Sequence, residues 1–238
     1  MIQNHNLPIG IIGAMDIEVN SLLSSMENPK ELKSAGISFF SGLLSGVPCV
    51  LAKSGVGKVN AAVCAQTMIL KFNPRVLINI GVAGGLSPEI HVGDFVVAAS
   101  CVQYDFDTSA LDNTAAGTIN ILGNYILDIP CDKAVSEALT KAAGEVYGNV
   151  FSGVIATGDS FIADTRRCSG LYRDFNALAC EMEGASIAQV CLMNNTPAAI
   201  LRAISDNAND TAHIDFPSFV TQTAEKTQLL MHKVLPLL

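Results

Sequence analysis

Short apolar runs alternate along the chain with amphipathic segments, and turns containing Gly, Ser or Asn separate them. Apolar runs rich in Ile, Val and Ala predict buried strands, whereas apolar positions at helical spacing predict helices that pack on a sheet. The expected strands are Ile9–Ala14, Phe39–Leu44, Pro48–Ala52, Arg75–Ile80, Asp94–Ser100, Val150–Thr157, Leu178–Cys180 and Ala198–Ile204. The expected helices are Asp16–Ser25, Lys58–Phe72, Lys133–Tyr147, Gly184–Asn194 and Pro217–Leu235.

This alternation of strands and helices predicts an α/β fold, a three-layer α/β/α sandwich around a central mixed sheet. A hairpin around Ser45-Gly46 adds an antiparallel part, and residues 107–130, rich in Asn, Thr and Gly, predict a long loop with a short strand. No repeat, low-complexity tract or polar linker interrupts the chain. We therefore expect one domain over residues 1–238.

The composition supports a buried sheet and reduces the number of plausible binding partners. Of 238 residues, 50% are hydrophobic and only 15% are charged, which suits a sheet covered on both faces. The net charge of −8 argues against nucleic acid or an anionic membrane as the main partner. Met1 to Pro8 lack the basic start of a signal peptide, and no apolar run is long enough to span a membrane.

The cysteines and histidines do not indicate a metal site. The seven cysteines form no Cys-x-x-Cys pair, and the four histidines are scattered. Cysteines in apolar runs are most simply reduced core thiols, so we expect a cytoplasmic protein without a bound metal.

Two carboxylates, Glu181 and Glu183, stand inside the otherwise apolar run from Leu178 to Leu192. Burying a carboxylate costs several kcal/mol unless it is hydrogen-bonded or neutralised. We therefore expect at least one of them to bind a ligand. The alternative is that a helix N-terminus and a nearby Arg satisfy both.

Two further carboxylates lie in similar settings. Asp206 follows an apolar strand, where burial would raise its pKa and let it act as a general acid near neutral pH. An ion pair with Arg202 is the alternative. Glu18 lies in the first turn of a predicted helix, where stabilisation of the helix dipole would explain it equally well.

Chemically unusual residues follow the carboxyl ends of several predicted strands, where open α/β sheets bind their ligands. The Gly81–Gly85 turn would let the backbone approach a ligand closely, but it matches neither a dinucleotide-binding nor a Walker pattern. Phe161 and Phe216 occupy polar, loop-like settings. They could form the flat apolar walls that a purine needs, or simply anchor their loops.

As an ordered set, six motifs between Gly10 and Phe216 resemble those of bacterial 5'-methylthioadenosine/S-adenosylhomocysteine nucleosidases, in the nucleoside phosphorylase/hydrolase superfamily. The motifs are Gly10-Ile11-Ile12-Gly13-Ala14-Met15-Asp16-Ile17-Glu18-Val19, Lys53-Ser54-Gly55-Val56-Gly57-Lys58-Val59-Asn60-Ala61-Ala62, Asn79-Ile80-Gly81-Val82-Ala83-Gly84-Gly85, Thr157-Gly158-Asp159-Ser160-Phe161-Ile162, Glu181-Met182-Glu183 and Arg202-Ala203-Ile204-Ser205-Asp206. The resemblance implies a cofactor-free homodimer that hydrolyses the N-ribosidic bond of these adenine nucleosides. It leaves open the ranking between methylthioadenosine, S-adenosylhomocysteine and 5'-deoxyadenosine.

The resemblance also implies a role for each site residue. Asp206 would protonate N7 of adenine, Glu18 would activate water, and Glu183 would bind the ribose 2'- and 3'-hydroxyls. The other implied substrate contacts are Met182 beside the sugar, Phe161 stacked on adenine, the Ile162 backbone at the adenine edge, Val82, Ala83 and Gly84 along the sugar and base, and Val56 and Phe216 around the 5'-alkylthio group.

The chain departs from the family pattern in two places. Val82 stands where many members have Ser, so Ser205 or a water would have to supply the hydroxyl that orients Asp206. The segment from Tyr104 to Leu111, and residues 112–130 after it, also diverge; in the family this region contributes to the dimer and to the adjoining subunit's 5'-group pocket.

Two other classes of function stay open from the sequence. A phosphorylase must hold a phosphate dianion, which Asp16 and Glu18 would repel. Hydrolysis is therefore favoured over phosphorolysis, although another base or 5'-group is possible for either reaction. A nucleoside-binding module without turnover would have no use for an acid and a water-activating base together.

Overall fold

The structure, a computed structural model, describes residues 7–147 and 149–238. Within these residues ten strands form one mixed sheet, in the order β11-β10-β6-β12-β5-β1-β4-β3-β2, and β9 pairs with β6. The strands are β1 (Ile9–Gly13), β2 (Glu27–Ser34), β3 (Ile37–Leu44), β4 (Val47–Lys53), β5 (Val76–Gly85), β6 (Phe95–Gln103), β9 (Ile129–Pro130), β10 (Val150–Thr157), β11 (Ala177–Glu181) and β12 (Ala198–Asp206), while β7 (Ile119–Ile121) and β8 (Asn124–Ile126) form a separate hairpin.

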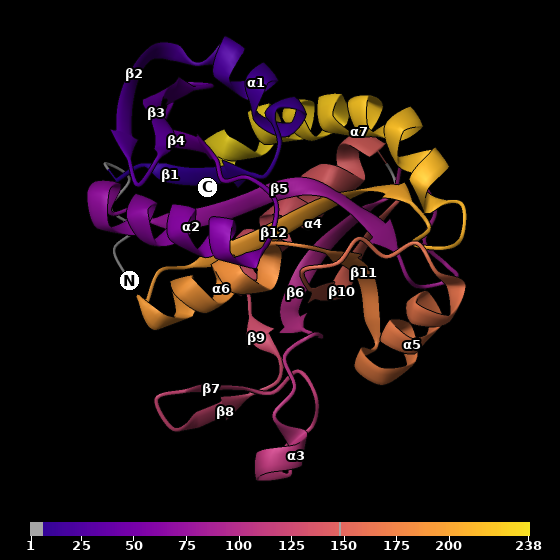
Figure 1. The fold of residues 1–238 in the computed structure, drawn as a ribbon. Coiled ribbons are helices and arrows are strands. Elements are labelled where there is room, and N and C mark those ends of the chain that lie inside the picture. The colour runs from indigo at the N-terminus through magenta and orange to yellow at the C-terminus, as the bar shows by residue number, and fades with distance from the viewer. Residues whose placement is uncertain (1–6, 148) are drawn as a thin grey trace.

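Helices cover both faces of the sheet, as the alternating sequence pattern predicts (Figure 1). The helices are α1 (Asp16–Ser25), α2 (Lys58–Phe72), α3 (Ser109–Asp112), α4 (Lys133–Tyr147), α5 (Thr165–Phe175), α6 (Gly184–Met193) and α7 (Ala212–Val234), followed by the 3-10 turn η1 (Leu235–Leu237). Helices α2 and α6 pack on one face, and α1, α4 and α7 pack on the other. The predicted three-layer sandwich with a mixed sheet is confirmed.

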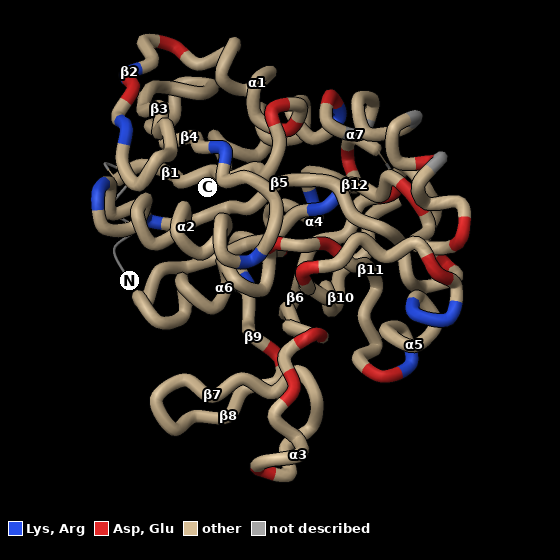
Figure 2. Tube along the Cα trace, in the orientation of Figure 1, with Lys and Arg blue, Asp and Glu red and all other residues tan. Residues whose placement is uncertain are grey.

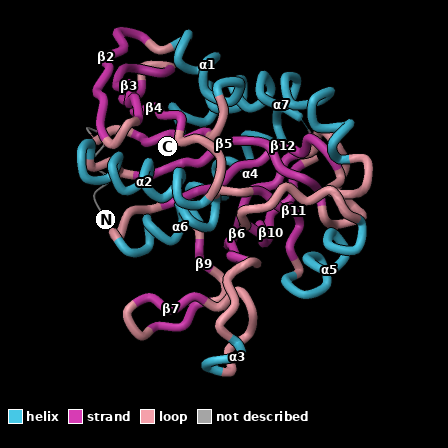
Figure 3. Tube along the Cα trace, viewed as in Figure 1, coloured by secondary structure: helices cyan, strands magenta, loops and turns pink. Residues whose placement is uncertain are grey.

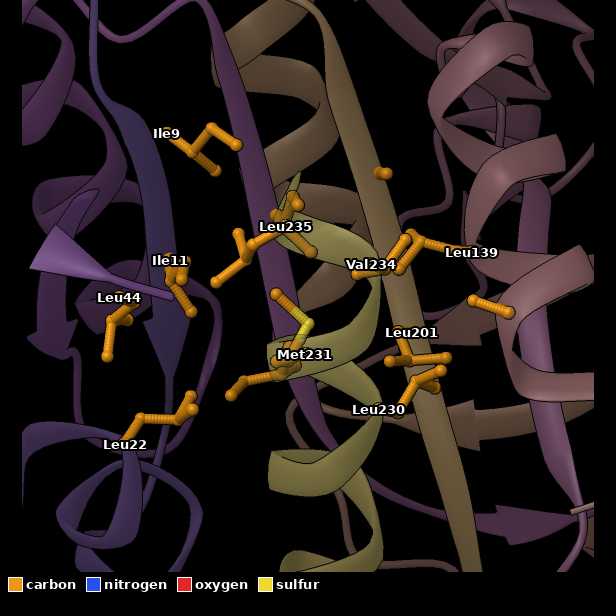
Figure 4. Packing of buried hydrophobic residues seen from close by; sticks show 14 of the residues in the cluster. Ile9, Ile11, Leu22, Leu44, Leu139, Leu201, Leu230, Met231, Val234 and Leu235 are labelled. Carbon is orange, nitrogen blue, oxygen red and sulfur yellow. The ribbon is translucent and has the colours of Figure 1, made fainter. Parts of the chain in front are cut away.

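The central strands β1 and β12 are buried along their whole length because both of their faces are covered. All five residues of β1 and all nine of β12 are buried. On one side, Leu230, Met231 and Val234 of α7 pack against the strands, and Figure 4 shows them between Ile11 and Leu201. This core fixes the sheet that carries the site.

Strand β5 is longer than its apolar stretch predicts. The sequence predicts a strand that ends at Ile80 and a glycine turn after it, but the ladder continues to Gly85. The final residues of β5 pair with β12 on one side and, antiparallel, with Cys180 and Ala179 of β11 on the other. The glycine run is therefore strand, and it draws the ends of β5, β11 and β12 together.

Besides the short elements between residues 107 and 130, two elements have no counterpart among those predicted. Strand β2 is polar and exposed at the edge of the sheet, so it lacks the alternation that marks a half-buried strand. In helix α5 only Cys168 and Leu171 are buried, and most of its other residues are polar or charged. Asp164 caps it by accepting a hydrogen bond from the Arg167 N–H at 2.7 Å, a signal that sequence reading could have used.

The closing helix also begins earlier than predicted. Pro is common in the first turn of a helix, so the sequence places the start at Pro217. Helix α7 instead begins at Ala212 and carries Pro217 inside it. The Asp215 N–H already donates to the Thr211 carbonyl at 3.1 Å, so the missing Pro N–H costs this helix one bond without ending it.

Residues 107–128 form an arm that extends from the body of the molecule, and Figure 3 shows it as a short helix and a hairpin joined by loops. A long loop with a short strand is predicted here, so the helix α3 and the β7–β8 pairing are corrections. Leu111 on α3 and Leu122 at the hairpin tip are 88% and 93% exposed. The arm thus presents apolar side chains to its surroundings.

Basic residues are scattered along the trace, with a visible concentration only on α5 (Figure 2). A nucleic-acid-binding surface usually carries clustered Lys and Arg along one face. None of the helices in the described part of the chain is both long and apolar enough to cross a membrane.

Candidate active site

A cavity of about 460 Å³ opens where the ends of β1, β5, β10, β11 and β12 meet the first turns of α7. Its walls come from seven separate parts of the chain. Every predicted site residue lines it, namely Glu18, Val56, Val82, Ala83, Gly84, Phe161, Ile162, Met182, Glu183, Asp206 and Phe216. The cavity is also lined by Ala14, Met15, Ser160, Cys180, Glu181, Ser205 and His213.

Glu18 turns back over the N-terminus of its own helix. One carboxylate oxygen accepts the Ala14 and Met15 N–H groups at 2.7 and 2.9 Å, and the other accepts the Val82 N–H at 3.2 Å. Burial raises the pKa of Glu18, and these amides and the nearby Arg202 oppose that rise. The site therefore holds a carboxylate with greater than ordinary affinity for a proton.

The neighbouring strand must lack a side chain for Glu18 to reach this position. A Cβ on Gly81 would lie 2.8 Å from Glu18 Oε1, which is closer than real Cβ atoms come to other atoms. The glycine of β5 thus permits the carboxylate to approach the backbone of that strand.

Asp206 ends β12 and is 2% exposed. Its Oδ2 accepts the Ser205 hydroxyl at 2.9 Å, and its Oδ1 accepts the Ala208 N–H at 2.8 Å. Burial raises the pKa of Asp206, while these two hydrogen bonds oppose the rise. Of the two groups considered for supplying a hydroxyl to Asp206, Ser205 or a water, Ser205 makes this contact.

The predicted alternative for Asp206, an ion pair with Arg202, is wrong. The Arg202 guanidinium donates instead to Glu181 and to the Asn79 side chain, and all three groups are buried. Burial lowers the pKa of Arg202, but the negative charges of Glu181 and Glu183 raise it by more, so the pKa lies above its ordinary value. Arg202 therefore stays charged behind the cavity, and among the described residues no ion pair with Asp206 is formed.

Glu181 and Glu183 have different surroundings. Glu181 accepts the Glu183 and Gly184 N–H groups at 3.0 and 2.7 Å, in addition to Arg202 and the Thr157 hydroxyl. The N-terminus of α6 and Arg202, the kinds of structural partner that were expected, thus satisfy Glu181.

The only hydrogen bond described for the Glu183 side chain is from the Gly57 N–H, which donates to Oε1 at 2.8 Å. Burial, and then repulsion by Glu181, raise the pKa of Glu183 to about 7. Glu183 is thus the carboxylate of the pair that retains capacity for a ligand.

Apolar side chains form the remaining walls. The rings of Phe161 and Phe216 meet edge to face, with their centroids 5.7 Å apart. Ile162 is buried beside them, and Val56 is 47% exposed at the opening. His213 joins this wall without having been predicted; it lies three residues before Phe216, the spacing that places two side chains on one helix face.

The cavity thus combines several carboxylates with flat apolar walls. Glu18, Glu181, Glu183 and Asp206 all line it, and the buried Arg202 compensates only part of their charge. Such a site disfavours a phosphate dianion and favours a ligand in which positive charge develops. Aromatic and aliphatic walls of this kind suit a planar base.

The comparisons with known proteins agree with this geometry. The model of the phosphorylase superfamily matches residues 8–236. The 5'-methylthioadenosine/S-adenosylhomocysteine nucleosidase of Shewanella halifaxensis is 38% identical over 226 residues, which cover 94% of this chain and 97% of that protein. The chain therefore belongs to the phosphorylase superfamily and, within it, to the family of the 5'-methylthioadenosine/S-adenosylhomocysteine nucleosidases.

Solved structures show the same relationship. The nucleosidase of Neisseria meningitidis, in complex with methylthio-immucillin-A, superposes with a TM-score of 0.92 at 34% identity, covering 97% of this chain and 99% of that one. The futalosine hydrolase of Helicobacter pylori gives a TM-score of 0.90 at 32% identity, with 98% of both chains covered. The nucleoside phosphorylase-like fold is thus confirmed, and the neighbours include hydrolases of more than one nucleoside.

Proposed function

We propose that the protein hydrolyses the N-ribosidic bond of 5'-methylthioadenosine and S-adenosylhomocysteine, releasing adenine and the 5-thioribose product. The observation that carries this proposal is the placement of two buried carboxylates with raised pKa, Glu18 and Asp206, on one cavity that also holds Glu183. Cleavage of an N-ribosidic bond needs an acid for the base, an activated water and a grip on the sugar, and these three groups supply them.

On the base side, Asp206 protonates N7 of adenine as the bond to ribose breaks. A protonated base leaves as a neutral molecule, which lowers the barrier. Because burial raises the pKa of Asp206, more of it keeps its proton near neutral pH than an ordinary Asp would. The Ser205 hydroxyl and the Ala208 N–H fix the orientation of this carboxyl.

On the opposite side, Glu18 orients the attacking water and takes its proton. The three backbone N–H groups that bind Glu18 hold its carboxylate in one position. Its raised pKa makes it a stronger base than an exposed Glu. The positive charge of the ribosyl transition state is stabilised by the surrounding carboxylates.

Other residues that line the cavity contact the sugar, the base and the 5'-group of the substrate. Glu183 binds the ribose 2'- and 3'-hydroxyls, and Met182 lies beside the sugar. Phe161 stacks on adenine while the Ile162 backbone reads its edge, and Val82, Ala83 and Gly84 line the sugar and base. Val56 and Phe216 enclose the apolar 5'-alkylthio group, whose sulfur suits such a wall.

The backbone amides around Glu18 favour hydrolysis over phosphorolysis. Free N–H groups at a helix N-terminus are a ready site for an anion. Here the Ala14, Met15 and Val82 N–H groups all donate to Glu18. A phosphate would have to displace this carboxylate and then remain beside it, which like-charge repulsion opposes.

We further propose that residues 1–238 form one catalytic domain that works as a cytoplasmic homodimer. Helix α2 exposes Val59, Val63 and Leu70, which are 73%, 42% and 72% exposed, and apolar patches of this kind mark protein interfaces. The seven cysteines, all within the described residues, are free thiols, as a reducing compartment would keep them. Sedimentation equilibrium tests the dimer, and a single species with the mass of one chain would contradict it.

A second candidate substrate is futalosine, because a structural neighbour of similar likeness is a futalosine hydrolase. Adenine release from methylthioadenosine, S-adenosylhomocysteine and 5'-deoxyadenosine should be measured alongside cleavage of futalosine, with and without phosphate. The proposal predicts adenine release from the first two at a rate that phosphate does not change. Cleavage of futalosine alone, or turnover only with phosphate, would overturn it.

A further inference from the structure

We propose that Lys58, Asp105 and Asp159 form a hydrogen-bonded ring that positions the base-binding loop, residues 158–162, against the ribose-binding wall. This inference rests on the proposed function, which assigns Phe161 and Ile162 of that loop to adenine. It makes the three residues positioning residues for base recognition, because none of their side chains lines the cavity.

The ring closes through three contacts from three separate elements. The Lys58 Nζ donates to Asp105 Oδ1 at 2.5 Å, and the Asp159 N–H donates to Asp105 Oδ2 at 2.9 Å. The Lys58 N–H donates to Asp159 Oδ1 at 2.8 Å and completes the circuit. The ring therefore joins the start of α2, the segment after β6 and the loop after β10.

Tyr104, next to Asp105, holds the same loop from its other side. A Cβ on Gly158 would lie 2.3 Å from the Tyr104 ring, so the ring packs directly on the glycine backbone. The Tyr104 hydroxyl donates to the Ser160 carbonyl at 3.3 Å, and the Tyr104 N–H donates to the Thr157 carbonyl at 3.1 Å. Tyr104 and Asp105, the two residues after β6, thus hold the three residues that precede Phe161.

The ring also reaches the ribose side of the cavity. Gly57 and Lys58 are adjacent, and their N–H groups donate to Glu183 and Asp159 respectively. One turn of backbone at the start of α2 therefore holds both the carboxylate assigned to ribose and the loop assigned to adenine. The distance between base and sugar contacts is set through this turn.

The energetics favour positioning over stabilisation as the role of the ring. The Lys58 and Asp105 side chains are 18% and 29% exposed, and partly exposed ion pairs add little to the free energy of unfolding. In contrast, a misplacement of about 1 Å in a binding group can cost about 100-fold in rate. Loss of the ring should therefore appear in base binding more than in thermal stability.

Binding of the separate halves of the substrate tests this inference. The variants are Asp105→Asn, which removes the charge and keeps the shape, and Lys58→Met, which removes the cation and keeps the backbone donor. The control is Glu145→Gln, which removes the Lys233–Glu145 ion pair, 3.0 Å long and away from the cavity. Calorimetry gives the Kd of adenine and of 5-methylthioribose, and adenine release gives kcat and KM.

We expect each ring variant to weaken adenine binding about tenfold and to leave thioribose binding within about twofold, because only the base loop loses its support. The double variant, with Lys58→Met and Asp105→Asn together, should bind adenine no more weakly than the weaker-binding single variant. Both substitutions remove the same contact, the Lys58–Asp105 ion pair, so their effects should not add. Unchanged adenine affinity, equal weakening of both ligands, or additive losses would each overturn the inference. Failure of the wild-type protein to release adenine would instead refute the proposed function, so the two failures are distinguishable.

Discussion

Replacement of Glu183 by Gln should make the ligand-free protein more stable at alkaline pH while impairing its function. Gln keeps the shape of Glu and an oxygen that can accept the Gly57 N–H, which now donates to Glu183 at 2.8 Å. What it removes is the negative charge that burial and Glu181 disfavour. The substitution thus isolates the cost of holding a ribose-binding carboxylate ready in an empty pocket.

The size of that cost follows from the pKa. The pKa of Glu183 is raised from its ordinary value of 4.5 to about 7. Between these values the folded protein retains a proton that the unfolded chain has lost, so the free energy of unfolding falls as the pH rises through this window. Since one pKa unit corresponds to about 1.4 kcal/mol, the loss is about 3 kcal/mol once the pH exceeds 7. Gln has no such loss.

Urea denaturation of the ligand-free wild type and Glu183→Gln at pH 5 and pH 8 measures this difference. The variant should gain about 2 to 3 kcal/mol relative to wild type between the two pH values. Glu137→Gln is the matched control, because the Glu137 side chain is 68% exposed and lies 3.8 Å from Lys133. Adenine release by Glu183→Gln should fall at least about tenfold, since the ionised acceptor for the ribose hydroxyls is lost.

The reasoning would be refuted if Glu183→Gln and wild type changed in parallel between pH 5 and pH 8. That result would mean that Glu183 is ionised in the folded protein without a penalty. A gain of the same size in Glu137→Gln would show that the effect comes from net charge rather than from the buried carboxyl.

Three further predictions concern the charged groups of the site. Asp206→Asn should lower kcat by about 10³-fold, because the proton donor is lost, while methylthioadenosine still binds. Single-turnover kinetics together with a binding titration checks this, and a near-wild-type kcat would exclude Asp206 as the acid. Glu18→Gln should lower hydrolysis to a similar extent in the same assays, whereas retained activity would show that another group activates the water. Arg202→Met should lower the free energy of unfolding by about 3 to 5 kcal/mol, because it leaves Glu181 charged and unpaired in the interior. Urea denaturation measures that loss, and an unchanged midpoint would contradict the role of the pair.

The sequence predicts the layers and the location of the site well, because both depend on local patterns. Strand β10 and helices α1, α2 and α4 have the predicted bounds, since apolar runs and breakers mark them clearly. The cavity residues converge because they follow the carboxyl ends of strands, and that rule needs no three-dimensional information.

The errors arise where tertiary contacts override local pattern. The sequence predicts a turn at the glycines of β5. They continue the strand instead, because Glu18 and the ends of β11 and β12 approach the backbone of β5 closely. Arg202 is close to Asp206 in sequence and was therefore its expected partner. The register of β12 shifts between Ile204 and Asp206, and Glu181 at the end of β11 lies within hydrogen-bond distance of the Arg202 guanidinium, so Arg202 pairs with Glu181 instead.

The central claim, that water attacks the ribose while adenine leaves, is tested most directly by following the oxygen atom. The protein is incubated with methylthioadenosine in water labelled with heavy oxygen, in phosphate-free buffer, and the sugar product is analysed by mass spectrometry. The account predicts one labelled oxygen on the thioribose for each adenine released, at a rate that added phosphate does not alter. Release of adenine only with phosphate, and recovery of a sugar phosphate without label, would contradict it.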